Sequence, residues 1–369
     1  MNAVTTPIVL ICLDGCSWEY IRSSNMPNLR EIGRTGISIT CKSMVPTVTN
    51  VNNASILTGR FSTEHGITGN YYYDKSNQSM IYMDSAIFLR CNTLLQEASN
   101  KGVRTLLLTV KDKLRRLMNR GATTSLSVEN PSPWILKEIG KPPSIYSADS
   151  STWLLDATLK TLEKKLYDII YVSTTDYIPH KYEPRYTEAT EYMEKIDKKI
   201  GLLADKDVIL GVTADHGMNN KRVKVDLQKL LSERGIKTKV VPIIKDEYVE
   251  HHQNLGGSVY LYLERDLEKA LTILQDAEGV EAVHTKNEAK KAYMLPSDRI
   301  GDLFVLGTKD AVFGPVKKGL YEDVNVRSHG SLHERDVLLI MNQKMKSVNE
   351  LFNKDAFQKL LQNVNVFHF

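Results

Sequence analysis

The chain has 369 residues, of which 42% are hydrophobic and 25% are charged, and its formal net charge is +4. These proportions are typical of a soluble globular protein with a full-sized core, built as one large domain or as a domain with an insertion. The mild charge, without a dense Lys/Arg block, gives no indication of a nucleic-acid partner. No apolar run approaches the ~20 residues of a membrane helix, so we expect no membrane span.

The cysteines and the N-terminus both favour a cytoplasmic protein. Cys12, Cys16, Cys41 and Cys91 lack the paired spacing of zinc ligands and the pattern of a disulfide framework, so we expect free, mostly buried thiols. The opening residues MNAVTT lack the basic region of a signal peptide. The sequence leaves the oligomeric state open, with a homodimer as one alternative.

Four buried-strand patterns along the chain each end in polar residues. PIVLICL precedes Asp14, RTLLLTV precedes Lys111, YDIIYVS precedes Asp176 by two threonines, and DVILGVT precedes Asp215 and His216. Short β-branched runs of this kind are typical of strands that are buried on both faces. Ligands of parallel sheets bind beyond the carboxyl ends of the strands, where these polar residues would lie.

Helical patterns lie between the strand patterns. MPNLREIG has Pro27 near its start, where proline is tolerated. From Tyr186 to Leu203 apolar residues recur every three or four positions, which predicts an amphipathic helix. Strands alternating with helices predict an α/β fold whose mostly parallel central sheet carries helices on both faces.

The pattern changes after about residue 225. KTKVVPII, GGSVYLYL and a helical run around Leu267, Leu271 and Leu274 predict a smaller α+β lobe over residues 226–325. RDVLLIMN then predicts a strand that returns to the core. The chain is thus predicted to have a core formed by residues 1–225 and 326–369, interrupted by this lobe.

Residues 46–53, PTVTNVNN, concentrate hydroxyl and amide side chains just before an apolar run. One interpretation is that Thr49 is a nucleophile at the start of a helix, with Asn50, Asn52 and Asn53 supplying donors around it. The other is an ordinary helix cap, a position that Thr and Asn favour for their local hydrogen bonds. This stretch by itself favours the cap.

Five candidate metal ligands follow the predicted strands: Asp14, Asp176, His180, Asp215 and His216. The four-residue spacing of Asp176 and His180 suits one helical turn or a tight loop, and the proline between them favours the loop. Carboxylate and imidazole together suit zinc, with Mn²⁺ or Fe²⁺ less favoured. Three Asp and two His exceed the needs of one tetrahedral ion, so we expect two metals about 4 Å apart. The alternative is that each Asp caps a helix and each His lies on the surface.

These motifs resemble a known superfamily in order and in spacing, over essentially the whole chain. ICLDG, PTVTN with NNASILTG, EHGITGN, TTDYIPH, TADHGM and RSHG are similar to the motifs of the alkaline phosphatase superfamily. Within it they resemble the branch of nucleotide pyrophosphatases/phosphodiesterases and phosphonoacetate hydrolases. The resemblance implies an alkaline phosphatase-like core that holds two Zn²⁺ at the carboxyl end of the sheet, with a threonine nucleophile between them.

The resemblance also implies a role for each residue. Asp14, Thr49, Asp215 and His216 would bind one zinc, and Asp176, His180 and a third histidine would bind the other. RSHGSLHE offers His329 for that third place because it precedes a glycine, with His333 as the weaker candidate. His65 matches no ligand position, so we expect it to be structural. Thr49 is preferred to Thr47 as the nucleophile because the motif places the nucleophile just before the asparagine-rich turn.

The predicted substrate follows from two further motifs that resemble phosphonoacetate hydrolases. Asn70 in the GN turn would contact the phosphonate, and Lys111 and Lys113 of the K-D-K motif would bind the substrate carboxylate. The implied reaction cleaves the C–P bond of phosphonoacetate to acetate and phosphate through a covalent phosphothreonine. Cations beside the carboxylate are needed because the leaving carbon departs as a multiply negative enediolate. The alternative for KDKLRR is a solvated basic helix start.

Two other functions stay open. A nucleotide pyrophosphatase/phosphodiesterase would use the same metals and Thr49, but it would need aromatic surfaces for the base. Tyr71, Tyr72 and Tyr73 are candidates for those surfaces, although such a run is equally consistent with strand packing. A non-catalytic binding protein on the same fold is the third interpretation. The complete ligand set argues against it.

Overall fold

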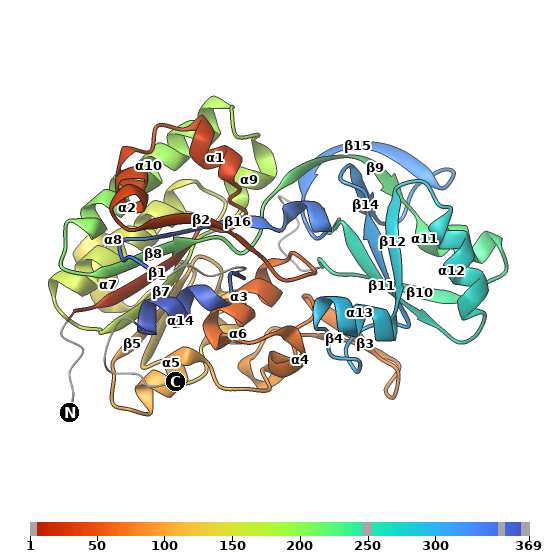
Figure 1. Cartoon of the computed structure of the whole chain (residues 1–369), viewed down its shortest axis with the longest axis horizontal. Helices are drawn as coiled ribbons and strands as arrows, with labels where there is room; N and C mark the ends of the chain where they lie inside the picture. The colour runs from red at the N-terminus through yellow and green to blue at the C-terminus, as the bar shows by residue number, and fades with distance from the viewer. Residues whose placement is uncertain (1–5, 246–252, 346–350, 363–369) are drawn as a thin grey trace.

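The computed structural model describes residues 6–245, 253–345 and 351–362 of the chain. Its largest sheet has seven strands in the order β2-β16-β8-β1-β7-β5-β6 (Figure 1). All pairs in this sheet are parallel except those of β16, which runs antiparallel to β8 and β2. The strands are β1 Ile8–Cys12, β2 Ile37–Lys42, β5 Thr105–Thr109, β6 Thr124–Ser127, β7 Ile169–Ser173, β8 Ile209–Thr213 and β16 Asp336–Met341.

The four predicted buried strands are neighbours in the middle of this sheet. Every residue of β1, β5, β7 and β8 is buried, which explains their near-continuous apolar sequences. The strands are in register, since Cys12 of β1 lies beside Ser173 of β7 and Thr213 of β8. Their carboxyl ends therefore meet at one level of the sheet edge, and the predicted mostly parallel α/β sheet is confirmed.

Helices cover both faces of the central sheet, as predicted. Figure 1 shows α2, α8 and α10 above it and α3, α5, α6 and α14 below it. The helices of this part of the chain are α1 Trp18–Ser23, α2 Pro27–Thr35, α3 Thr49–Thr58, α4 Ser62–His65, α5 Leu94–Ser99, α6 Asp112–Met118, α7 Pro133–Ile139, α8 Asp149–Glu163, α9 Tyr177–Lys181, α10 Thr187–Ala204 and α14 Asp355–Gln362. Two 3₁₀ turns span Ala86–Phe88 and Leu332–Glu334.

The two helices expected for the core, before residue 225, both form. In α2, Pro27 is the first residue, and the Asp197 carboxylate of α10 accepts hydrogen bonds from the backbone N–H groups of Asn28 and Leu29. The Asp197 carboxylate thus accepts from backbone donors at the α2 N-terminus. The N-cap residue, Met26, makes no such hydrogen bond through its side chain. Tyr186 is the exposed N-cap of α10, so the buried stripe begins one turn later than predicted, at Ala189.

Smaller sheets form the right half of the molecule in Figure 1. A four-stranded antiparallel sheet has the order β10-β11-β13-β12, a three-stranded sheet has the order β14-β9-β15, and β3 pairs with β4. Their elements are β3 Tyr71–Asp74, β4 Ser79–Tyr82, β9 Asn219–Val225, β10 Thr238–Pro242, β11 Ser258–Leu263, β12 Val280–Thr285, β13 Leu303–Gly307, β14 Ala311–Phe313, β15 Tyr321–Ser328, α11 Leu227–Glu233, α12 Leu267–Gln275 and α13 Lys286–Tyr293.

The chain enters and leaves this region through two paired strands. β9 leads away from the central sheet and β15 leads back toward it, and the two are antiparallel neighbours. RDVLLIMN forms β16, which joins the central sheet as expected. The boundaries proposed at residues 225 and 326 stay a prediction.

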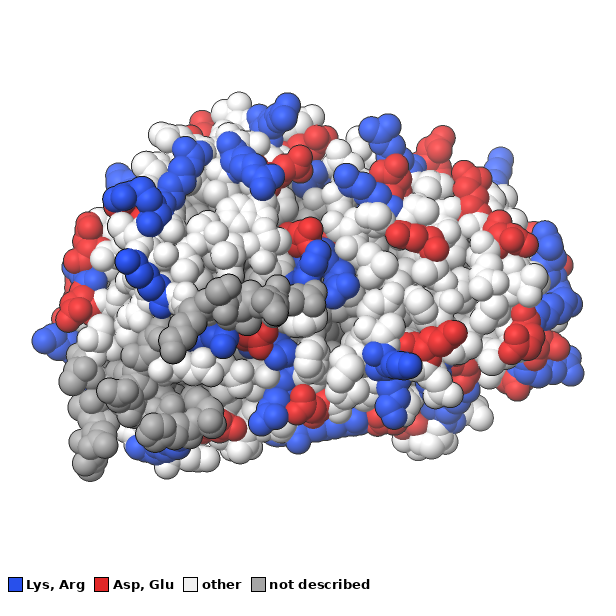
Figure 2. Space-filling view, in the orientation of Figure 1, with Lys and Arg blue, Asp and Glu red and all other residues white. Residues whose placement is uncertain are grey.

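The surface and the helices give two further observations. Across the described ranges, no helix combines the length and the hydropathy needed to cross a bilayer. On the face shown in Figure 2, Lys and Arg side chains are interspersed with Asp and Glu, and no block of one sign dominates.

Candidate metal centre and substrate pocket

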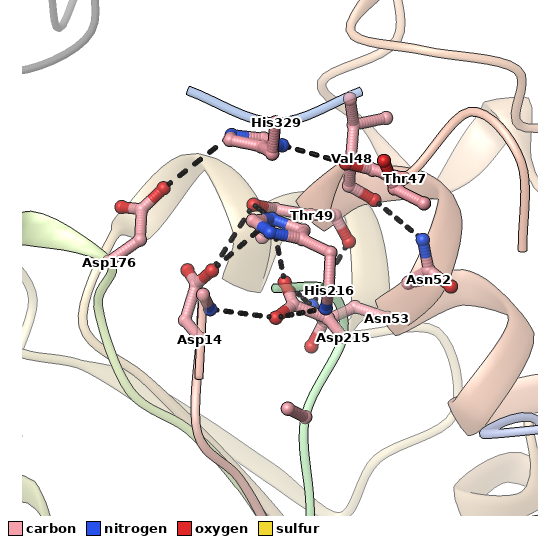
Figure 3. Close-up of polar contacts among 12 residues, drawn as sticks. Asp14, Thr47, Val48, Thr49, Asn52, Asn53, Asp176, Asp215, His216 and His329 are labelled. Atoms are coloured by element: carbon pink, nitrogen blue, oxygen red, sulfur yellow. Dashed lines mark hydrogen bonds and ion pairs between the residues drawn. The ribbon is translucent and has the colours of Figure 1, made fainter. Parts of the chain in front are cut away.

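The candidate site lies where three central strands end. Asp14 follows β1, Asp176 follows β7, and Asp215 with His216 follows β8. Because these strands are adjacent and in register, residues about 40 to 200 positions apart in sequence converge at one sheet edge. Figure 3 shows the Asp14, Asp215 and His216 side chains close together near Thr49, with Asp176 directed toward His329.

The first cluster joins Asp14, Asp215 and His216, whose ligand atoms all lie within 4.8 Å of one another. His216 Nε2 is 3.6 Å from Asp14 Oδ1 and 3.5 Å from Asp215 Oδ2. The Thr49 hydroxyl completes the group, at 3.2 Å from His216 Nε2 and 3.4 Å from Asp14 Oδ1. This is the set predicted for one metal ion.

The second cluster joins Asp176, His180 and His329 by the same criterion. His180 Nε2 is 3.0 Å from Asp176 Oδ2, and His329 Nε2 is 4.0 Å from the same oxygen. The expectation of a loop here is wrong, because Tyr177–Lys181 form a short helix with Asp176 as its N-cap. Pro179 is compatible with it because it lies in the first turn, where backbone N–H groups need no helical acceptor.

The backbone sets the orientation of all three histidines. Nδ1 of His180 lies 2.8 Å from the carbonyl oxygen of Arg327, Nδ1 of His216 lies 2.9 Å from that of Gly217, and Nδ1 of His329 lies 2.7 Å from that of Thr47. A carbonyl oxygen only accepts, so each Nδ1 carries the proton and donates it. Each Nε2 therefore faces the centre of the site, which is the arrangement found in metal-ligating histidines.

The charge of the site calls for cations. Asp14, Asp176 and Asp215 are at most 3% exposed. Burial, and then the charges of the other two carboxylates, raise the pKa of Asp14 well above its ordinary value. Burial likewise raises the pKa of Asp215 to about 6. Burial and the neighbouring imidazoles hold the pKa of His329 well below its ordinary value, so it is a neutral potential ligand.

These residues fit metal ions in number and in chemistry. Three clustered carboxylates are costly to bury without positive charge, and neutral imidazole nitrogens beside them are ligands that zinc and related ions prefer. Two Asp/His triads at one sheet edge are consistent with a bimetallic site. The identity of the metal and the catalytic roles of the residues stay predictions.

Thr49 is the first residue of α3 and does not cap it, so the cap interpretation is wrong. The N-cap is Val48, which has no side-chain acceptor. The Thr49 side chain is left to face the first cluster, and it also lines a pocket beside the clusters. The tertiary context has overridden the capping preference of threonine.

The three neighbouring asparagines do not all serve the pocket. Asn50 lines it, as expected. Asn52 instead bonds backbone groups of Met44 and Val48, and Asn53 points beneath the first cluster. Asn53 lies four residues after Thr49, on the same face of α3, and there it contacts Asp215 instead of lining the pocket.

A pocket beside the clusters brings the predicted substrate residues together. Asn70, Lys111 and Lys113 line it with Thr49, and the space open to the centres of water molecules is about 40 Å³. Lys111 is the N-cap of α6, and its Nζ lies 3.0 Å from Asp176 Oδ1. Both lysines of the KDKLRR segment thus line the pocket, whereas its two arginines do not.

The arginines of the same segment have a different role. Nε of Arg115 donates to Oδ1 of Asp112 at 2.6 Å, and Arg116 lies 3.9 Å from the same carboxylate. Their charge is thus partly balanced within α6. The interpretation of a solvated helix start fits Arg116, whose side chain is 52% exposed, but not Arg115, which is 15% exposed, nor the lysines that line the pocket.

The remaining candidates lie outside the two clusters. His333 Nε2 is 2.6 Å from Glu281 Oε2, so between the two histidines of RSHGSLHE only His329 belongs to a cluster. His65 is fully buried and pairs with Ser55 at 2.9 Å, which is a structural position. Tyr71 is buried in β3 and stacks on Tyr82, as expected for strand packing.

Several supporting residues were not found from the sequence. Asn353 donates through Nδ2 to the backbone oxygens of Ala214 and Asp215, from far along the chain. Thr174 accepts the backbone N–H of Asp14, and Ile244 lines the pocket. Thr174 carried a signal, its place at a strand end, whereas Asn353 and Ile244 carried none.

The chain matches known proteins over most of its length. A family model described as type I phosphodiesterase / nucleotide pyrophosphatase matches residues 8–331. The phosphonoacetate hydrolase of Sinorhizobium meliloti 1021, solved in complex with phosphonoacetate, is 32% identical with a TM-score of 0.89, covering 97% of this chain and 95% of that one.

More distant relatives share the fold or part of the sequence. Murine ectonucleotide pyrophosphatase / phosphodiesterase 5 is 16% identical with a TM-score of 0.72, over 98% of this chain and 96% of that one. Bis(5'-adenosyl)-triphosphatase enpp4 of Xenopus laevis is 24% identical over 61% of this chain, which spans about half (51%) of that protein. The match to the family model and the sheet with its two Asp/His triads together lead to one conclusion. The chain belongs to the type I phosphodiesterase / nucleotide pyrophosphatase family of the alkaline phosphatase superfamily, and it has the fold of a phosphonoacetate hydrolase.

Proposed function

We propose that this protein is a phosphonoacetate hydrolase with two divalent metal ions, which cleaves the C–P bond to give acetate and phosphate. The observation that carries the proposal is the pocket in which Lys111 and Lys113 face Thr49 and the two Asp/His clusters. A substrate with a phosphonate at one end and a carboxylate at the other matches such a pocket in charge. Further support comes from the similar phosphonoacetate hydrolase of Sinorhizobium meliloti, which was solved in complex with phosphonoacetate.

The proposed chemistry begins at Thr49. Two zinc ions held by the clusters, with Mn²⁺ or Fe²⁺ as alternatives, would lower the pKa of the Thr49 hydroxyl and neutralise charge on the phosphonate. Thr49 Oγ gives up its proton and forms a bond to phosphorus, and the C–P bond breaks with its electron pair on carbon. The carbon then takes up a proton to give acetate. Water hydrolyses the phosphothreonine, which releases phosphate and restores the hydroxyl.

Lys111 and Lys113 would make the leaving group acceptable. An alkyl carbanion is far too basic to leave, whereas a carboxylate on the same carbon spreads the charge as an enediolate. Ammonium groups beside that carboxylate stabilise charge that develops only in the transition state. Asn70, which lines the same pocket and whose backbone is hydrogen-bonded to Ile243 and Met83, would orient the phosphonate.

A nucleotide phosphodiesterase is the second candidate. The family model favours it, and so does Tyr82, which is 40% exposed and lies 5.7 Å from Lys113 Nζ, as a surface for a base. The Tyr71–Tyr73 strand does not line the described pocket. Tyr82 is not a lining residue either, and its support for this candidate rests on its exposure and its distance to Lys113.

A substrate panel with added zinc distinguishes the candidates. Phosphonoacetate, methylphosphonate, 4-nitrophenyl phosphate and a nitrophenyl nucleotide diester are compared by phosphate or nitrophenolate release. We expect the highest kcat/KM on phosphonoacetate and no turnover of methylphosphonate, which lacks the carboxylate. A higher kcat/KM on the nucleotide diester would replace the proposal with the second candidate.

A further inference from the structure

Asn53 lies directly beneath the first cluster. It belongs to α3, one helical turn after Thr49, and is fully buried. Its Nδ2 donates to the backbone oxygen of Thr49 at 3.0 Å and to Oδ2 of Asp215 at 3.4 Å. The same amide therefore contacts the residue predicted to be the nucleophile and a predicted ligand of its metal (Figure 3).

A buried tyrosine determines which way this amide faces. Tyr171 lies in the middle of β7, is fully buried, and donates its hydroxyl proton to Asn53 Oδ1 at 2.7 Å. A hydroxyl that instead met the NH₂ group would have to accept, and the Asn53 oxygen would then face the Asp215 carboxylate. Two oxygen acceptors in contact in a buried site are unfavourable, so the Tyr171 bond keeps Nδ2 toward Asp215.

Asp215 is in turn held by donors on both oxygens. Its Oδ1 accepts the backbone N–H groups of Gly15 and His216, at 3.1 and 2.9 Å. Its Oδ2, the oxygen that faces His216 Nε2, accepts from Asn53. Asn53 is thus the side chain that fixes the carboxylate oxygen pointing into the first cluster.

We propose that Asn53 and Tyr171 are positioning residues that set the metal affinity of the Asp14/Asp215/His216 cluster without affecting the other. The inference rests on the proposed two-metal function. The second cluster has separate supports, because His180 donates to Arg327, His329 donates to Thr47, and Asp176 pairs with Lys111. Loss of such a supporting hydrogen bond typically weakens metal binding about 10- to 100-fold.

The test measures zinc affinity one cluster at a time. Chelator-stripped protein is titrated with Zn²⁺ against a chromophoric competitor in two backgrounds. His180→Ala leaves the first cluster complete, and His216→Ala leaves the second. We expect Tyr171→Phe to weaken zinc binding about tenfold in the first background, and Asn53→Asp to weaken it more, because a carboxylate oxygen then faces Asp215. Neither change should alter the affinity in the second background by more than about twofold.

Tyr260→Phe is the matched control, since Tyr260 is an equally buried tyrosine whose hydroxyl donates to the backbone oxygen of Thr68, at the lobe. It should leave both affinities unchanged. Thermal unfolding of each stripped variant checks that it folds. Unchanged affinities in both backgrounds, or equal losses in both, would overturn the inference.

The inference and the proposed function fail differently. A wild-type protein that binds no divalent ion would overturn both. Tight binding of two ions without phosphonoacetate turnover would overturn the proposed substrate and leave the positioning role intact.

Discussion

At the scale of single residues, Thr47 and Thr49 differ in what their hydroxyls contact. Thr47 Oγ1 donates to the backbone oxygen of Ser331 at 2.9 Å and accepts the N–H of Gly330, so it fixes the loop that carries His329. Thr49 Oγ1 faces the first cluster instead. The resemblance preferred Thr49 to Thr47 as the nucleophile, and this assignment stays a prediction.

We expect Thr49→Ala to lose nearly all turnover while keeping the fold and both bound metals, because the six Asp and His ligands remain. Thr47→Ser, which keeps the hydroxyl, should retain most activity. The measurement is kcat on phosphonoacetate together with metal content. An active Thr49→Ala protein would show that the nucleophile is another group.

The second prediction at this scale concerns Lys113. If Lys113 stabilises the enediolate, Lys113→Ala should lower kcat/KM on phosphonoacetate roughly 10²-fold. This factor corresponds to a loss of about 3 kcal/mol of transition-state stabilisation. The leaving group of 4-nitrophenyl phosphate is a stable nitrophenolate, so the variant should keep most of its activity on this ester. Arg116→Ala is the control in the same segment, since Arg116 pairs with Asp112 and lies outside the pocket lining. Equal losses on both substrates would assign Lys113 to the support of the site.

At the scale of elements, His65 links the nucleophile helix to its neighbour. It ends α4, its Nδ1 accepts the backbone N–H of Ile67, and its Nε2 therefore carries the proton shared with Ser55 of α3 at 2.9 Å. Burial, with a small contribution from Arg299, lowers the pKa of His65 to about 3. This neutral side chain holds α3 against the turn that leads to Asn70.

The depressed pKa of His65 predicts a pH dependence of stability. The unfolded chain binds a proton at His65 below about pH 6.5, whereas the folded chain does so only near pH 3. The free energy of unfolding therefore falls as pH is lowered from 6.5 toward 3, by up to about 1.4 kcal/mol per pH unit from this group.

A variant without this titration tests the assignment. His65→Gln should be less stable at pH 7, because it loses packing, but its stability should fall less steeply with pH than that of the wild type. Urea unfolding of both proteins in the presence of a chelator, at several pH values between 4 and 7, measures the two slopes. Parallel slopes would mean that His65 is not neutral in the fold.

At the scale of the whole molecule, we expect metal ions bound at the sheet edge to stabilise the folded protein as well as to support catalysis. The two triads join segments that follow three different strands to the loop of His329. We expect prolonged chelation to abolish hydrolysis and to lower the melting temperature, because an ion that binds only the folded state stabilises it. Zinc should restore both, with two equivalents bound by elemental analysis. Full activity in metal-free protein would contradict the two-metal mechanism.

Much of the fold could be predicted because its signals are local. β1, β5, β7 and β8 are continuous apolar runs, and the stripe of α10 has the helical period, so each pattern reports its own burial. The polar residues after these strands could be placed at one edge because parallel strands all present their carboxyl ends there. The resemblance to a known superfamily added His329 and the pocket lysines, which spacing alone did not select.

What only the tertiary structure decided was the surroundings of each side chain. The sequence by itself determined the strand and helix segments, the α/β class and the five metal-ligand candidates that follow the strands. It did not determine that Asp176 begins a helix, that Thr49 faces the cluster and caps nothing, or that Asn53 and Asn353 support Asp215. The surroundings of Thr49 and the support of Asp215 depend on contacts between residues more than a hundred positions apart. Such contacts exist only once the sheet has brought its strand ends together, so no local pattern can record them.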